Sequence, residues 1–182
     1  AELEAEVERA AQALVVAGVE PGDRVALWLM NRPEWLFLFY AVARVGAVLV
    51  PLNTRFREDD VRFVLGHAGA TTLVQSDVSG PVDFLAMTRA VLPALGATGN
   101  APGDPADPAF PQLRRVVTVG AERHDGVLHW ADLVAAAGTA PPGLAVEVAR
   151  RSAAVSPDGT ALIVYTSGTT GFPKGAMHSH RC

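Results

Sequence analysis

One short run of residues near the end of the sequence is rich in side chains that bind phosphate. It reads Thr166-Ser-Gly-Thr-Thr-Gly-Phe-Pro-Lys174-Gly, with four hydroxyl residues, three glycines and one lysine. Glycine lets the backbone adopt positive φ angles and come close to a ligand, so successive N–H groups can converge on an anion. The hydroxyl groups add donors, and Lys174 adds a full charge. This combination suits a polyphosphate, whose oxygens need several donors at once.

The lysine of this run is the only lysine in the sequence, which has 15 basic residues. All the other cations are arginines. A compact ammonium fits against a phosphate oxygen in a tight loop, where a forked guanidinium would be bulkier. Chance placement of a single residue is the alternative interpretation of Lys174.

The run differs from the P-loop of the Walker A type. That motif places Gly immediately before Lys and Ser or Thr immediately after it, and a helix begins there. Here Pro173 precedes Lys174 and Gly175 follows it, and apolar or alternating residues at 161–165 and 176–180 indicate a strand on each side. We therefore expect a phosphate loop at 165–175 between two strands. An irregular Ser/Thr/Gly connector is the alternative, which the density of phosphate donors disfavours.

The rest of the sequence alternates between helical and strand patterns. Short apolar runs indicate strands buried on both faces, and apolar residues spaced by three to four indicate amphipathic helices. This alternation predicts an α/β fold, with a mostly parallel sheet and helices on both faces. Asn31 is expected to cap the second helix. The expected helices are 3–17, 34–44, 58–67, 82–95 and 130–137, and the expected strands before the loop are 24–30, 47–52, 71–75 and 115–119. Residues 97–112, rich in Pro and Gly, are expected to form an exposed irregular loop, and 138–143 form a second such patch.

Composition narrows the classes of function. The 182 residues carry a formal net charge of -4, which gives no electrostatic reason to expect binding to nucleic acid or to an anionic membrane. The most apolar stretch, 36–50, is shorter than the ~20 residues of a spanning helix and contains Arg44, so no integral membrane segment is expected. Cys182 is the single cysteine, which fits a cytoplasmic location. The chain starts without Met and stops just after the loop, so we expect it to be an excerpt.

The sequence resembles the adenylate-forming, or AMP-binding, enzymes. The residues that carry the resemblance are 165–180, Tyr-Thr-Ser-Gly-Thr-Thr-Gly-Phe-Pro-Lys-Gly-Ala-Met-His-Ser-His. Residues 18–27, 31–35 and 46–55 are similar, in the same order, to the N-terminal region of acyl-CoA synthetases. The Gly-Ala-Val-Leu-Val-Pro-Leu-Asn run favours these over peptide-synthetase adenylation domains. Residues 1–182 would then be the first part of a large N-terminal AMP-binding domain.

The resemblance implies a two-step reaction, in which a carboxylate attacks the α-phosphate of Mg-ATP and a thiol, usually that of coenzyme A, then displaces AMP. It implies ATP, Mg²⁺, coenzyme A and a fatty or aryl acid as ligands. The residues it assigns to the β- and γ-phosphates are Thr166, Ser167, Gly168, Thr169, Thr170, Gly171 and Lys174. The family's acidic metal ligand and the lysine of its C-terminal lid match no residue up to 182. No catalytic or metal-ligating residue is therefore expected in this chain, and we expect it to be inactive alone.

Other interpretations remain open. A domain that loads a carrier protein, or a non-catalytic nucleotide-binding relic, would share the same loop. His178, His180 and Cys182 alternate and could face one way on a strand, but three ligands so close on one strand make a poor tetrahedral metal site. The acidic residues 58–60 are expected to start a helix. The aromatic residues of 35–40 are expected to pack, and His67, His124 and His129 receive no role.

Overall fold

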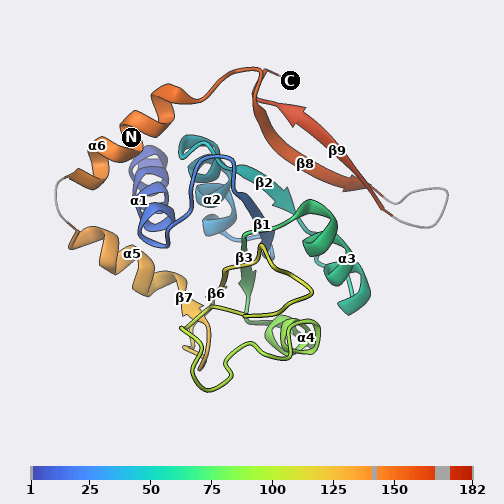
Figure 1. Cartoon of the computed structure of the whole chain (residues 1–182). Helices are drawn as coiled ribbons and strands as arrows, with labels where there is room; N and C mark the ends of the chain where they lie inside the picture. The colour runs from blue at the N-terminus through green and yellow to red at the C-terminus, as the bar shows by residue number, and fades with distance from the viewer. Residues whose placement is uncertain (1, 141–142, 167–172, 182) are drawn as a thin grey trace.

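The chain folds around one seven-stranded sheet (Figure 1). In this computed structural model the described residues are 2–140, 143–166 and 173–181. Six of the strands form parallel pairs, and the last is antiparallel to its neighbour. In sheet order, the strands are β7 (Leu128–His129), β6 (Arg115–Val119), β3 (Thr72–Ser76), β1 (Arg24–Trp28), β2 (Val48–Pro51), β8 (Thr160–Thr166) and β9 (Lys174–Ser179). A separate two-stranded ribbon pairs β4 (Val78–Ser79) with β5 (Val82–Asp83).

Helices cover both faces of the sheet, which confirms the predicted fold class. One group lies on the side drawn at the left of Figure 1, and a second group lies on the opposite side. The first group is α1 (Glu2–Val16), α2 (Pro33–Arg44), α5 (Trp130–Gly138) and α6 (Gly143–Ala154). The second group is α3 (Glu58–Ala68) and α4 (Phe84–Val91).

Strand β1 shows why its sequence is almost entirely apolar. Val25 and Leu27 contribute to the core beneath α1 and α2, whereas Ala26 and Trp28 contribute to the core beneath α3 and α4. Successive side chains of a strand point to opposite faces, so a strand covered on both sides has no polar position to spare. The apolar stretch 36–50 likewise runs from α2 into β2.

The bounds of one predicted helix and the predicted cap of another were wrong. The helix expected at 82–95 is confined to α4, because Val82 and Asp83 pair in the β-ribbon and Pro93 keeps Leu92 out of the helical region (φ -122°, ψ 74°). Asp83 caps this helix, and its side chain accepts a hydrogen bond from Ala86 N–H. The N-cap of α2 is Arg32 in extended conformation, without a capping hydrogen bond from its side chain, so Asn31 is not the cap.

Helix α6 was not predicted, because it follows a Pro/Gly patch and places an arginine on its inner face. Arg151 is buried, and its guanidinium donates to the Val19 carbonyl, to Glu20 Oε2 at 2.9 Å and to Glu147 Oε1 at 2.7 Å. Val148 is buried on the same helix. The guanidinium therefore ties α6 to the turn between α1 and β1.

The Pro-rich loop is irregular, as predicted, but only part of it is exposed. Gly103 and Phe110 are buried, and Phe110 joins the core beneath α3 and α4. Gly103 N–H donates to the Gly126 carbonyl, and Val116 N–H donates back to the Gly103 carbonyl. The loop therefore covers one side of the core instead of projecting into solvent.

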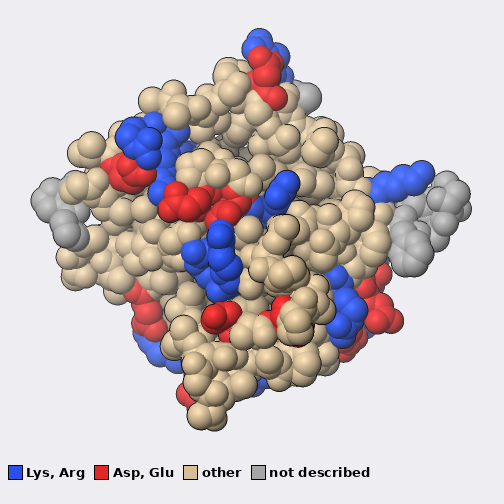
Figure 2. Space-filling model, viewed as in Figure 1, with Lys and Arg blue, Asp and Glu red and all other residues tan. Residues whose placement is uncertain are grey.

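Charges of both signs are interspersed on the face shown in Figure 2, which has no broad area of one sign. Several arginines of the described chain form ion pairs, for example Arg114 with Asp23 at 2.6 Å. Among the described residues, no helix is both long enough and apolar enough to span a bilayer.

Candidate functional site

The predicted phosphate loop lies between the two strands of a hairpin. β8 and β9 pair antiparallel, with Tyr165 opposite Gly175 and Thr166 opposite Lys174. Thr166 and Lys174 are both exposed, so these two residues face each other across the ladder at the mouth of the loop. The other predicted phosphate ligands, Ser167, Gly168, Thr169, Thr170 and Gly171, lie outside the described residues.

The hairpin brings this mouth to the carboxyl edge of the sheet. β8 runs parallel to β2, and β2 is parallel to β1, so the carboxyl ends of these strands share one edge. In open α/β sheets ligands bind at that edge, because the loops that follow the strands converge there. Thr166 ends β8 and Lys174 begins β9, so both lie where such a fold places its ligands.

Gly175 serves a different purpose from the one expected of a loop glycine. It lies within β9, opposite Tyr165, and its φ is not positive. A Cβ added at this position would lie 3.0 Å from Ile163 Cγ2 and 3.2 Å from Tyr165 Cζ. Gly175 therefore leaves room for the Tyr165 ring to lie across the hairpin near its loop end.

Tyr165 connects the hairpin to helix α3, a contact that the sequence did not predict. Its hydroxyl lies 2.7 Å from His67 Nδ1, and its ring meets His67 edge-on, with centroids 5.7 Å apart. Phe63, one helical turn before His67, stacks on the imidazole at 5.2 Å. Burial raises the pKa of the Tyr165 hydroxyl above its usual value, so this group stays protonated and able to donate. Ninety-eight positions separate the two bonded residues, and no local spacing could reveal the pair.

A second polar cluster lies at the carboxyl ends of β1, β3 and β6. It borders a hollow of about 640 Å³ lined by Arg32, Asp77 and His124, among others. Arg32 donates to both oxygens of Glu34 and to the Val119 carbonyl. The bonds to Glu34 raise the pKa of the guanidinium and lower the pKa of the carboxyl. His124 Nε2 lies 3.4 Å from Asp77 Oδ2, so Arg32 and Asp77 each have a polar side-chain partner in this cluster.

The remaining residues considered in the sequence, 178–182 and 58–60, do not form a further site. β9 ends at Ser179, so His180 lies in a turn and the alternation expected of residues 178–182 does not continue. Within the described part of the chain, no three His, Cys, Asp or Glu residues form a group able to hold a metal. Glu58 starts α3, as predicted.

The packing predicted for the aromatic residues 35–40 is observed, and His129, to which the sequence assigned no role, also has a partner. Trp35 stacks on Phe39, with centroids 5.5 Å apart. His129 Nε2 lies 3.2 Å from the Gly120 carbonyl, so this histidine fills a structural position between β6 and β7.

Comparison with known proteins decides the family. The sequence matches the AMP-binding enzyme family over residues 1–182. The chain belongs to this family. A CoA ligase of Mycobacterium tuberculosis strain H37Rv, which acts on a methyl-dioxo-octahydroindenyl propanoyl group, is 38% identical over 181 residues and is matched over 99% of this chain and 31% of its own length.

A second relative is the long-chain-fatty-acid–CoA ligase FadD13 of the same species. It is 33% identical over 180 residues, which are 99% of this chain and 29% of the relative. Among solved structures, the anthranilate CoA ligase AuaEII in complex with anthranoyl-AMP matches with a TM-score of 0.76 at 23% identity, over 98% of this chain and 29% of that one. This likeness supports the fold. The chain thus spans about a third of the length of these relatives.

Proposed function

We propose that this chain supplies the ATP-binding loop of an enzyme that activates a fatty or aryl acid as acyl-AMP and transfers the acyl group to coenzyme A. The observation that carries the proposal is the pairing of Thr166 with Lys174 at the mouth of the loop, at the carboxyl edge of the sheet. Membership of the AMP-binding enzyme family supports the nucleotide. In this proposal residues 1–182 form the first part of the N-terminal AMP-binding domain.

The chemistry assigned to the loop is to grip Mg-ATP by its outer phosphates. A carboxylate oxygen forms a bond to the α-phosphorus as the bond to the β-phosphate oxygen breaks, which gives acyl-AMP and pyrophosphate. Charge builds on the departing pyrophosphate, and fixed donors that already point at that position stabilise it. The donors proposed for the β- and γ-phosphates are the side chains or backbone of Thr166, Ser167, Gly168, Thr169, Thr170, Gly171 and Lys174.

Coenzyme A is the acceptor that the relatives favour. Both M. tuberculosis relatives are CoA ligases by name, whereas a carrier-protein acceptor has no such support among them. The thiol attacks the acyl carbon of acyl-AMP and AMP leaves. Mg²⁺ enters with ATP and is held largely through its phosphates, as is usual for this ion.

The direct test is Lys174→Ala in the full-length protein, assayed by ATP–pyrophosphate exchange in the presence of fatty and aryl acids. Loss of a preorganised charge on the leaving group is expected to slow exchange by about 100-fold or more. Lys174 is exposed, so the unfolding temperature should not change. Lys174→Arg keeps the charge and should retain more activity. An unchanged exchange rate for Lys174→Ala would exclude the proposed grip.

A further inference from the structure

The loop end of the β8–β9 hairpin has few ties to the rest of the sheet. β8 joins β2 through one register pair, Leu49 with Leu162. Beyond that pair, towards the loop, β8 is bonded to β9, which is the edge strand. The residues at the mouth of the loop are therefore positioned by the hairpin itself and by the contacts that hold its loop end.

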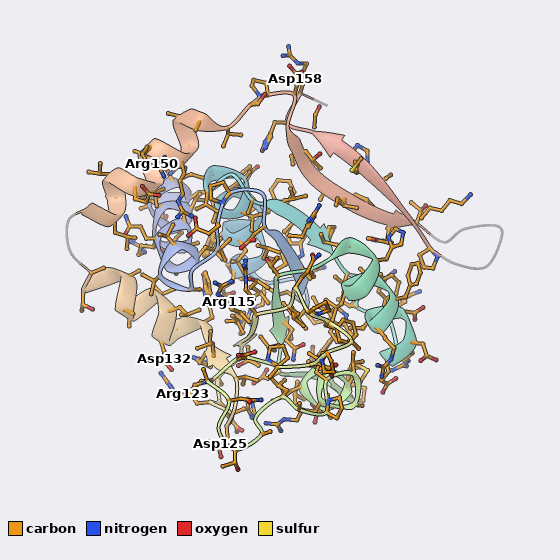
Figure 3. All side chains as sticks on the ribbon, in the orientation of Figure 1. Arg115, Arg123, Asp125, Asp132, Arg150 and Asp158 are labelled. Carbon is orange, nitrogen blue, oxygen red and sulfur yellow. The ribbon has the colours of Figure 1, made fainter. Side chains whose placement is uncertain are left out.

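Among the described residues, one polar side-chain contact lies near each end of the hairpin. At the end far from the loop, Arg181 Nε donates to Asp158 Oδ1 at 2.7 Å, and both side chains are largely exposed. Figure 3 shows Asp158 at that end. At the loop end, the Tyr165 hydroxyl and His67 Nδ1 lie 2.7 Å apart. Tyr165 directly precedes Thr166 in the chain, so its contact lies next to the mouth.

The contact at the loop end has a fixed geometry. Phe63 and His67 lie four positions apart on α3, so they share one face of that helix. Their rings are nearly parallel, at 20°, and Tyr165 meets them at 90° and 84°. Gly175 leaves the space that the tyrosine ring occupies across the hairpin. The tyrosine ring therefore contacts α3 as well as the neighbouring strand β9.

We propose that His67 is a positioning residue for the phosphate loop. Through its hydrogen bond to Tyr165, it holds the loop end of the hairpin on α3 and so places Thr166 and Lys174 for the nucleotide phosphates. This inference rests on the proposed ATP-binding function and adds a residue to it. His67 itself does not need to touch the ligand.

The test uses the full-length protein and two variants that remove the hydrogen bond but keep the rings. Tyr165→Phe removes the hydroxyl, and His67→Phe removes the imidazole nitrogen but can still stack on Phe63. Each is expected to raise the Kd for Mg-ATP and the KM for ATP about threefold, the low end for one hydrogen bond, because His67 is exposed. The double variant should be no weaker than either single one, because both remove the same bond.

Three controls separate positioning from general damage. His67→Asn offers a polar atom near the place of Nδ1 and should restore most of the affinity. Asp158→Asn weakens the contact at the other end of the hairpin, and Tyr40→Phe removes the hydroxyl of the other tyrosine, which lies on α2. Both should leave the Kd for Mg-ATP unchanged, and the KM for the carboxylic acid should stay the same in every variant.

Amide hydrogen exchange of residues 163–166 and 174–177, measured without nucleotide, gives a readout that does not depend on activity. It should be faster in Tyr165→Phe and His67→Phe than in the wild type. Unchanged exchange in both variants, or an unchanged Kd for Mg-ATP in both, would overturn the role of His67. Failure of the proposed function has a different signature, namely the same Kd for Mg-ATP in Lys174→Ala and the wild type.

Discussion

Tyr165 and Gly175 face each other across the β8–β9 ladder, and the ring of the tyrosine occupies the space in which a side chain of residue 175 would lie. The conformational freedom of glycine is not what this position needs. The requirement is steric, and it arises from the packing of β8 against β9. A glycine in the phosphate motif can therefore matter for ATP without approaching a phosphate.

Replacing Gly175 with alanine is expected to destabilise the fold. The new Cβ would lie 3.0 Å from Ile163 and 3.2 Å from Tyr165, and overpacking of this kind costs about 1–3 kcal/mol of unfolding free energy. Chemical denaturation measures it. Gly138→Ala is the control, because a Cβ there meets nothing within 4 Å, and in helix α5 it should raise the free energy of unfolding by up to about 1 kcal/mol and not lower it. Equal effects of the two substitutions would argue against the steric role of Gly175.

Replacing Arg151 with methionine should destabilise the protein, although methionine has a similar length. The substitution leaves the Val19 carbonyl without the guanidinium that it accepts from, and an unsatisfied buried acceptor costs about 1–3 kcal/mol. Arg150→Met is the control, because the Arg150 side chain is 67% exposed and pairs with Glu147 in solvent. Its effect should stay within about 1 kcal/mol. A larger loss for Arg150→Met than for Arg151→Met would contradict the anchoring of α6.

Acid should weaken the attachment of α6 in a defined pH range. Hydrogen bonds from Arg150 and Arg151 lower the pKa of the Glu147 carboxyl from 4.5 to about 2. A carboxyl whose pKa is lower in the folded state stabilises that state above its unfolded pKa, and the stabilisation disappears as the pH falls through the folded pKa.

The measurement is the unfolding free energy of the wild type and of Glu147→Gln between pH 7 and pH 2. The difference should be constant above pH of about 5 and should shrink as the pH falls from about 4.5 towards 2. A difference that stays constant down to pH 2 would show that the carboxylate charge of Glu147 does not contribute.

The sequence predicted the strands of the central sheet because their environment leaves a clear mark. A strand such as β1 is buried on both faces, so its residues are apolar almost without interruption. The end of α3 also follows from the sequence, because Gly69 closes the helix with a φ of 62°, which a residue without Cβ adopts at little cost. Short elements such as β7, with two residues, are below the length at which a period can be recognised.

The candidate site divides in the same way. The residues of the phosphate motif are consecutive in the chain, so the motif can be recognised from the sequence. The contact that holds the hairpin next to this motif is not local, since His67 and Tyr165 come together through the packing of α3 against β8. Helix α6 was missed for a related reason, because its inner face carries Arg151, whose charge is balanced by residues of another segment.

The sheet order also bears on how the chain folds. Leu49 and Leu162, which join β2 to β8, are the most distant in sequence of all the ladder pairs in this sheet. Bringing them together closes the longest loop, and its entropy must be lost before the contact is gained. We expect β1, β2, β3 and β6 to associate first, and the hairpin, whose own strands are neighbours in sequence, to join them last. The segment that would grip the nucleotide is then the last strand pair to be added, so errors late in folding would remove this grip and leave the rest of the sheet in place.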